Sequence, residues 1–286
     1  MNKIFTVILL AFSFLTSHSA EPIIIPLWNE KEPPESSGLS DDKEVVENEG
    51  WISFVTKPEL LVYPAKEPNG KALLMCPGGG YAGVAISHEG KAFADVLNKE
   101  GITVAVLKYR MPNHHYQVPS DDVYEALRIL ETNAAKWGIN PDKIGIGGAS
   151  AGGHLASTVA THPRENSLVP AFQILLYPVI SMKDGLTHSG SRFYLLGEDP
   201  SEELVDFFSN ELQVTPQTPP AFIAVSGDDK VVPVENSILY YSALKNNSVP
   251  ASLHIYPKGG HGWGVNPEFY YNELWISEMV NWLKDI

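Results

Sequence analysis

The residues best suited to chemistry lie around Ser150, in the segment Gly148–Gly152, which has the sequence GASAG. This G-x-S-x-G sequence follows a predicted strand and opens a predicted helix, which is the setting of a nucleophile elbow. Glycine or alanine fills every other position from Gly147 to Gly153, so a tight, strained turn meets no bulky neighbour. A phosphate-binding loop is excluded because no Gly-Lys-Ser/Thr follows. The segment predicts Ser150 as the nucleophile of an acyl-transfer reaction.

A serine nucleophile needs a histidine base and a carboxylate that orients the base. In sites built on such an elbow, the acid and then the histidine follow the serine along the chain. Asp228 and Asp229 come directly after a predicted strand, and His261 stands between glycines after the next strand. The carboxyl ends of parallel strands meet at one sheet edge, so these side chains are expected to converge on Ser150. Neighbouring aspartates point apart, and spacing alone does not choose between Asp228 and Asp229.

The other histidines among the nine in the chain are placed less well for this role. The adjacent pair His114 and His115 lacks the i, i+4 spacing of a helical zinc pair and has no Cys or Glu partner nearby, so no metal is expected. No cofactor is expected either. Each remaining histidine is predicted to lie in a less suitable place. His18 belongs to the leader, and His88 precedes the nucleophile. The others are His154 and His162 in or after the elbow helix, His188 in the cap and His254 in a strand.

Three successive glycines follow another predicted strand and offer an oxyanion hole. Gly78, Gly79 and Gly80 let the main chain approach a substrate while its N–H groups stay free. Gly79 or Gly80 is expected to act together with the N–H of Ala151, the residue after the nucleophile. A glycine run alone indicates only a flexible turn. Its position ahead of a G-x-S-x-G elbow is what predicts an oxyanion hole.

The elements that must position these residues alternate along the chain. Strands that alternate with helices predict a mainly parallel sheet covered on both faces. Residues 181–219 break the alternation and predict one or two short helices forming a small cap, whereas residues 21–50 predict an irregular lead-in to a catalytic domain at 51–286. Strands are expected at 60–63, 72–76, 102–109, 143–146, 172–177, 221–226 and 252–256, and helices at 91–100, 120–137, 152–161, 233–245 and 267–284.

The first twenty residues indicate an exported protein. Residues 1–20 carry Lys3, an apolar run and a small polar stretch, which is the layout of a signal peptide and too short for a membrane span. Secretion or a periplasmic location follows.

The single cysteine, Cys76, forms no intramolecular disulfide and is expected to be a small buried hydrophobe. A formal charge of −14 with no basic cluster excludes nucleic acid and favours neutral substrates.

Taken together, the motifs resemble the acetyl esterase and lipase-like branch of the α/β-hydrolase superfamily, from about Trp28 to the C-terminus. The resemblance implies the α/β-hydrolase fold, and its D-x-x-V-P pattern implies Asp229 as the acid of a catalytic triad. One departure is that Pro77 replaces the histidine of the His-Gly-Gly-Gly found in many relatives. The motifs are CPGGGY at 76–81, HEG at 88–90, KYRMP at 108–112, GASAGGHLA at 148–156, DKVVP at 229–233 and GHG at 260–262.

The chain is similar to secreted bacterial esterases that deacetylate xylan, which implies a serine esterase acting on small esters or acetylated oligosaccharides. A feruloyl esterase is an alternative, because Tyr81, Phe193, Tyr194 and Trp263 could form an aromatic pocket. Tyr81 and Trp263 are the candidate substrate-binding residues. A peptidase of the prolyl-oligopeptidase type would add a large gating domain that this sequence does not show. A non-catalytic glycan-binding module would not need the Ser, Asp and His set. The sequence predicts no oligomeric state.

Overall fold

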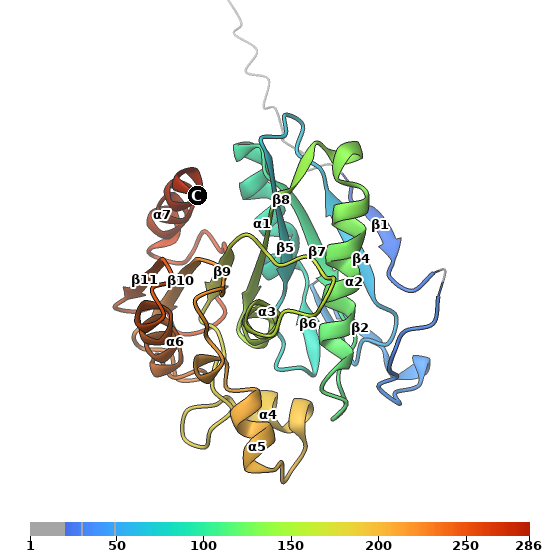
Figure 1. The fold of residues 1–286 in the computed structure, drawn as a ribbon, viewed down its shortest axis with the longest axis vertical. Helices are drawn as coiled ribbons and strands as arrows, with labels where there is room; N and C mark the ends of the chain where they lie inside the picture. Colours follow the sequence, from blue (N-terminus) through green and yellow to red (C-terminus); the bar gives the residue numbers. More distant parts are fainter. Residues whose placement is uncertain (1–20, 30, 49) are drawn as a thin grey trace, which may run out of the picture.

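The computed structural model describes residues 21–29, 31–48 and 50–286, and its centre is an eight-stranded sheet (Figure 1). The strand order is β1-β4-β7-β5-β8-β9-β10-β11. Strands β7 to β11 and β5 run parallel, whereas β4 pairs antiparallel with β7 and β1 antiparallel with β4. The predicted mainly parallel sheet is confirmed. Its strands are β1 Ile23–Pro26, β4 Glu59–Tyr63, β5 Gly70–Cys76, β7 Thr103–Lys108, β8 Ile139–Ala149, β9 Gln173–Leu176, β10 Ala221–Ser226 and β11 Ala251–Tyr256.

Helices cover both faces of the sheet, as the alternation predicted. Successive residues of a strand point to opposite faces, and in β5 both sets are apolar and buried. Leu73 and Met75 join one core cluster, and Leu74 and Cys76 join the other. The first face is covered by α1 Ala92–Leu97 and α7 Asn272–Asp285, and the second by α2 Val118–Thr132, α3 Ala151–Thr161 and α6 Glu235–Asn246.

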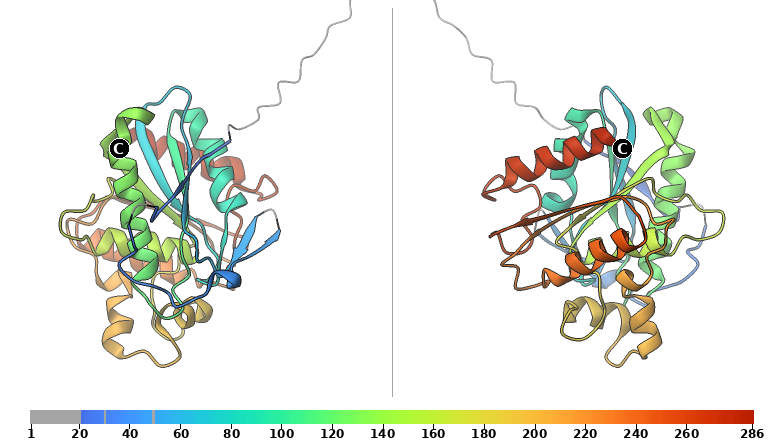
Figure 2. Two further views of the ribbon diagram at one scale, coloured as in Figure 1. Left: turned by 90° about the vertical axis from the view of Figure 1, so that its right-hand side faces the viewer. Right: turned by 60° about the vertical axis from the view of Figure 1, so that its left-hand side comes forward.

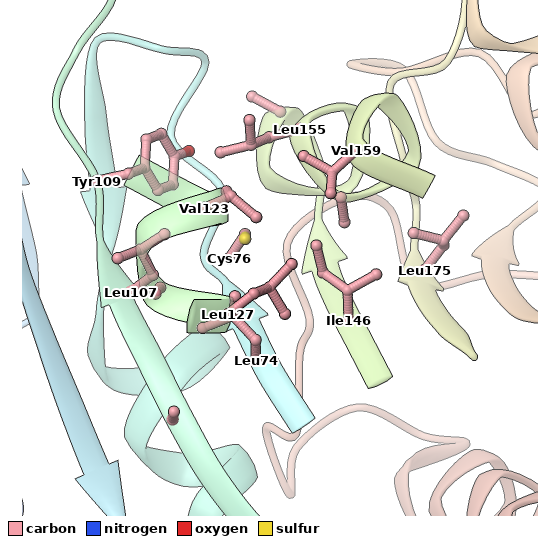
Figure 3. Close-up of a cluster of buried hydrophobic side chains, with 14 of the residues drawn as sticks. Leu74, Cys76, Leu107, Tyr109, Val123, Leu127, Ile146, Leu155, Val159 and Leu175 are labelled. Atoms are coloured by element: carbon pink, nitrogen blue, oxygen red, sulfur yellow. The ribbon is translucent and has the colours of Figure 1, made fainter. Parts of the chain in front are cut away.

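Figure 3 shows the second of these cores, between the sheet and helices α2 and α3. The buried thiol of Cys76 lies there among aliphatic side chains, as predicted for a small hydrophobe. Removal of this apolar surface from water is the main stabilising force of the fold. The labelled members are Leu74, Leu107, Tyr109, Val123, Leu127, Ile146, Leu155, Val159 and Leu175.

The N-terminal segment differs from the irregular lead-in predicted for residues 21–50. Strand β1 extends the large sheet by pairing with β4, and β2 Val45–Asn48 joins a three-stranded sheet with β3 Trp51–Ser53 and β6 Gly83–Ala85. The prediction was wrong for these stretches because their order comes from backbone pairing with distant strand edges, which local sequence does not show. The small sheet brings Trp51 next to the chain that follows the glycine loop.

Helix α2 begins earlier than its sequence predicted. The sequence predicted its start at residue 120, but the helix starts at Val118, so Ser120, Asp121 and Asp122 lie inside its first turns. Asp122 is fully buried, and its Oδ1 lies 2.7 Å from Nη2 of the Arg110 guanidinium in an ion pair. A buried carboxylate is tolerated when a cation and hydrogen bonds accompany it. Asp122 therefore forms an ion pair with Arg110 and does not cap its own helix.

Residues between β9 and β10 form the cap, which contains α4 Ser189–Leu196 and α5 Glu202–Phe207. Figures 1 and 2 show these helices, in yellow and orange, beyond one end of the sheet. Within the part of the chain that the structure describes, no helix is long and apolar enough to cross a membrane. Shorter elements are 3₁₀ helices at Asp41–Lys43, Asn98–Glu100, Ala134–Trp137 and Asn210–Leu212, and a π-helical turn at Ser87–Lys91.

Replacing Leu127 by Ala should lower the free energy of unfolding by about 2–5 kcal/mol, because the side chain is 1% exposed and its loss leaves a cavity. Urea unfolding followed by circular dichroism measures the change. Leu274→Ala is the matched control, since this leucine of α7 is 51% exposed and its loss should change stability by less than about 0.5 kcal/mol. Equal effects of the two substitutions would contradict the core described above.

Candidate active site

Ser150 occupies a strained turn between β8 and α3. Its backbone has φ 53° and ψ −122°, a conformation that residues other than glycine rarely adopt. Neighbouring main chain leaves no room for side chains: a Cβ at Gly148 would lie 2.1 Å from the Gly152 carbonyl oxygen, and one at Gly152 would lie 2.0 Å from that of Cys76. The small residues around the serine are therefore required by close backbone packing, and they hold Ser150 at the end of β8.

The structure brings Ser150, His261 and Asp229 together in one hydrogen-bonded series. Nδ1 of His261 lies 2.6 Å from Oδ2 of Asp229, and its Nε2 lies 2.8 Å from Oγ of Ser150. An ionised carboxylate can only accept, so Nδ1 carries the proton and, in the neutral ring, Nε2 accepts from the serine hydroxyl. The ring is thus held in the tautomer that can remove a proton from Ser150.

The two adjacent aspartates, which spacing alone did not separate, have different contacts. The Asp229 side chain is fully buried, and its second oxygen, Oδ1, accepts the N–H groups of Val231 at 2.8 Å and Val232 at 3.0 Å. These bonds orient the carboxylate toward His261. Asp228 instead accepts the N–H of Gly260 at 2.8 Å and holds the loop that carries the histidine.

The glycine loop after β5 faces Ser150 with free N–H groups. Gly79 has φ 150° and Gly80 has φ 63°, and a Cβ at Gly79 would lie 2.0 Å from the Gly83 carbonyl oxygen. Within the described residues, neither the Gly79 nor the Gly80 N–H donates a hydrogen bond. Ala151 is the first residue of α3, where helix N–H groups lack intrahelical acceptors. These donors are suited to a negatively charged oxygen.

The loop is braced without the histidine that Pro77 replaces. The Tyr109 hydroxyl donates to the Pro77 carbonyl at 2.8 Å, and the Gly78 N–H donates to Glu89 at 2.7 Å. Both contacts are buried. They fix the two residues that precede Gly79 and so set the direction in which its N–H points.

Glu89 also connects this loop to the histidine loop, a role that the sequence did not reveal. Its other oxygen accepts the Tyr177 hydroxyl at 2.7 Å, and that hydroxyl accepts the Gly264 N–H at 2.8 Å. Burial, reinforced by Glu89, raises the pKa of Tyr177 well above its usual value, so the hydroxyl stays protonated. The Tyr177 ring lies against that of His261, with ring centres 4.7 Å apart.

A cavity of about 430 Å³ opens over Ser150. His188, at the start of α4 in the cap, reaches this cavity, and its Nδ1 accepts the N–H of Ser191 at 3.2 Å. Burial lowers the pKa of His188, so the ring is neutral and its Nε2 carries the proton. The cap thus contributes a neutral imidazole to the wall of the cavity. The lining comprises Trp51, Gly78, Gly79, Gly80, Ala82, Ala85, His88, Glu89, Ser150, His188, Gly190, Tyr194, Val231, His261 and Gly262.

The two residues expected to bind substrate do not line the cavity over Ser150. Tyr81 is 1% exposed and its hydroxyl is hydrogen-bonded to His154 at 2.8 Å, so the structure corrects its assignment to the pocket wall. Trp263 is also buried and donates to Ser226 at 2.9 Å. Tyr81 belongs to one hydrophobic core cluster and Trp263 to the other. The aromatic wall of the cavity is instead formed by Trp51 and Tyr194.

The adjacent histidines His114 and His115 bind different partners. Nδ1 of His114 contacts the Phe193 carbonyl at 2.9 Å, and Nδ1 of His115 contacts Glu35 at 3.0 Å. Across residues 21–29, 31–48 and 50–286, no cluster of three or more His, Cys, Asp or Glu side chains is arranged to hold a metal ion.

Comparisons with known proteins show the family to which the chain belongs. A family model described as alpha/beta hydrolase fold matches residues 73–265. An acetylxylan esterase of Xylanibacter ruminicola is 40% identical over 235 residues, which cover 80% of this chain and 48% of that protein. Endo-1,4-beta-xylanase B of Butyrivibrio fibrisolvens is 38% identical over 215 residues, which cover 69% of this chain and 33% of that protein. The chain thus spans about half or less of these curated relatives.

A solved structure extends the likeness over nearly the whole chain. The acetyl ester-xyloside bifunctional hydrolase from Caldicellulosiruptor lactoaceticus superimposes with a TM-score of 0.80 at 34% identity, covering 94% of this chain and 98% of that one. Both the family model and this structural likeness show that the chain belongs to the alpha/beta hydrolase family.

Proposed function

We propose that this protein is a serine carboxylic-ester hydrolase that removes acetyl groups from xylan-type polysaccharides. The observation that carries the proposal is the series of hydrogen bonds from Ser150 through His261 to Asp229. An activated serine beside free backbone N–H groups is the arrangement that acyl transfer requires. The names of the relatives, an acetylxylan esterase and an acetyl ester-xyloside hydrolase, support an acetyl ester as the substrate.

The reaction begins when Oγ of Ser150 attacks the ester carbonyl carbon and Nε2 of His261 takes the hydroxyl proton. The carbonyl oxygen becomes negative and is held by the N–H groups of Ala151 and of Gly79 or Gly80. The bond to the alcohol oxygen then breaks, His261 returns its proton to that oxygen, and the acetyl group remains on Ser150. Asp229 stabilises the imidazolium through both stages.

Water completes the cycle by the same route. His261 removes a proton from water, the resulting hydroxide attacks the acetyl-serine carbonyl, and the same N–H groups hold the second oxyanion. Collapse of this intermediate releases acetate and returns the proton to Oγ of Ser150. No metal or cofactor enters either half of the proposed reaction.

A feruloyl ester is the second candidate, because the cavity is larger than an acetyl group needs and Trp51 and Tyr194 line it. Aromatic walls of this kind suit a planar aromatic acyl group. Release of acetate and of ferulate from native xylan, measured side by side, separates the two. Acetate release alone supports the acetyl esterase, and faster ferulate release would replace it by the feruloyl esterase.

Export from the cytoplasm belongs to the same proposal. Its support is the signal-like sequence of residues 1–20, which lie outside the described residues. An acetylated polysaccharide is too large to enter the cell, so a secreted or periplasmic enzyme fits this substrate.

Replacing Ser150 by Ala should lower kcat by about three to six orders of magnitude, because no other group supplies the nucleophile. Acetate release from a synthetic acetyl ester measures the loss, and labelling by a fluorophosphonate probe should disappear with it. Unchanged circular dichroism shows that the fold is intact. Near-normal turnover in this variant would end the proposal.

The adjacent aspartates provide a matched pair of substitutions. Asp229→Asn should reduce kcat about 10⁴-fold, because an amide no longer fixes the His261 tautomer. Asp228→Asn should reduce it less than about tenfold, since the amide oxygen still accepts the Gly260 N–H. Equal losses of kcat, or a larger loss in Asp228→Asn, would show that Asp229 is not the acid of the triad.

Glu89→Gln tests the connection between the two loops. A carboxylate accepts both the Gly78 N–H and the Tyr177 hydroxyl, whereas an amide leaves one buried donor without an acceptor. Unfolding free energy should fall by about 1–3 kcal/mol, and kcat should fall about tenfold with little change in KM. Glu131→Gln, on the exposed face of α2, is the control. An unaltered kcat in Glu89→Gln would show that the network does not position the site.

A further inference from the structure

A second hollow, of about 480 Å³, lies beside the cavity that opens over Ser150. His261 and Gly262 line both spaces, so the histidine loop forms the wall between them. The hollow is built mainly by the segment between β11 and α7, coloured orange to red in Figure 1. Its volume falls in the range of about 300–1,000 Å³ usual for ligand sites.

The direction of the reaction decides which part of an ester faces this hollow. The carbonyl oxygen must lie at the N–H groups of the glycine loop and Ala151, and the alcohol oxygen must lie within hydrogen-bond reach of Nε2 of His261, which returns its proton. The acyl group therefore occupies the cavity over Ser150. The alcohol part extends across His261, toward the second hollow.

The side chains of the hollow suit a neutral polyhydroxylated chain. Tyr270 is 77% exposed, and Lys258 Nζ lies 4.9 Å from its ring centre. An aromatic ring this exposed offers an apolar face for the C–H side of a sugar ring. Asp228, Glu268 and Asn266 also line the hollow and carry groups that can hydrogen-bond to sugar hydroxyls.

The hollow also has a wall of stacked aromatic rings and an excess of negative charge, which favours neutral over anionic sugars. Trp263 and Phe269 stack beneath it, with ring centres 4.4 Å apart and planes at 10°. Asp228 is anchored by the Gly260 N–H at 2.8 Å, and a carboxylate can accept further bonds on its other oxygen. Two carboxylates against one lysine, on a chain with a formal charge of −14, oppose polyanions.

We infer that this hollow is the subsite for the saccharide chain that carries the ester, with Tyr270 as its stacking platform. The inference rests on the proposed esterase function and adds where the leaving group binds. The chain of a neutral oligosaccharide runs from His261 over Trp263 to Tyr270, and units beyond the esterified sugar add binding energy there.

Kinetics on two substrates test the subsite. Tyr270→Ala should lower kcat/KM for an acetylated xylohexaose, relative to kcat/KM for 4-nitrophenyl acetate, about tenfold, a usual loss for one aromatic anchor. Tyr270→Phe should restore the ratio, because stacking needs the ring and not the hydroxyl. Phe207→Ala, which removes an exposed aromatic ring of α5, should leave the ratio unchanged. A Tyr270→Ala ratio equal to that of Phe207→Ala, or equal losses on both substrates, would overturn the inference.

Binding separates a failure of the subsite from a failure of the proposed function. Calorimetry of the Ser150→Ala protein with unsubstituted xylohexaose needs no hydrolysis. Weaker binding in the Ser150→Ala/Tyr270→Ala protein supports the subsite, and equal affinity in the two proteins contradicts it. If the wild-type protein hydrolyses no acetyl ester, the proposed function falls, and this comparison still decides whether Tyr270 binds the saccharide.

Discussion

The hydrogen bond between Nδ1 of His261 and the buried carboxylate of Asp229 is the interaction on which the site depends. It places the ring proton on Nδ1 and leaves Nε2 as the acceptor for the Ser150 hydroxyl. Asp229 can do this because the Val231 and Val232 N–H groups hold its other oxygen. Without that bond the imidazole could adopt the other tautomer, in which Nε2 is a donor and cannot take the serine proton.

The sheet and its two cores hold these groups in place relative to one another. Three loops at the carboxyl ends of β8, β10 and β11 carry the serine, the aspartate and the histidine, and the loop after β5 carries the glycine N–H groups. Both faces of the sheet are buried, so the strand ends are held by two cores. Glu89 and Tyr177 add buried hydrogen bonds that connect the glycine loop to the histidine loop.

Much of the fold and of the candidate site was predictable because it depends on short-range constraints. The elbow needs small residues around Ser150 for a reason confined to one turn, and buried parallel strands show as apolar runs. Long-range contacts escaped: β1 is ordered by pairing with β4, Tyr81 turns inward to bond His154, and Glu89 gains its partners from distant loops. The local sequence does not encode which distant donor will meet a given carboxylate. His188 was assigned to the cap, but its position at the cavity depends on how α4 lies relative to the sheet, which the local sequence does not show.

Nitrogen-15 NMR of histidine-labelled protein measures the central interaction directly, because the chemical shifts of the two ring nitrogens report which of them carries the proton. The His261 signals are assigned by their loss in a His261→Gln variant. At a pH where the ring is neutral, we expect the proton on Nδ1 and a bare Nε2 in the wild-type protein, with this preference lost in Asp229→Asn. A proton on Nε2 in the wild-type protein, or an unchanged preference in Asp229→Asn, would contradict the proposed arrangement of the site.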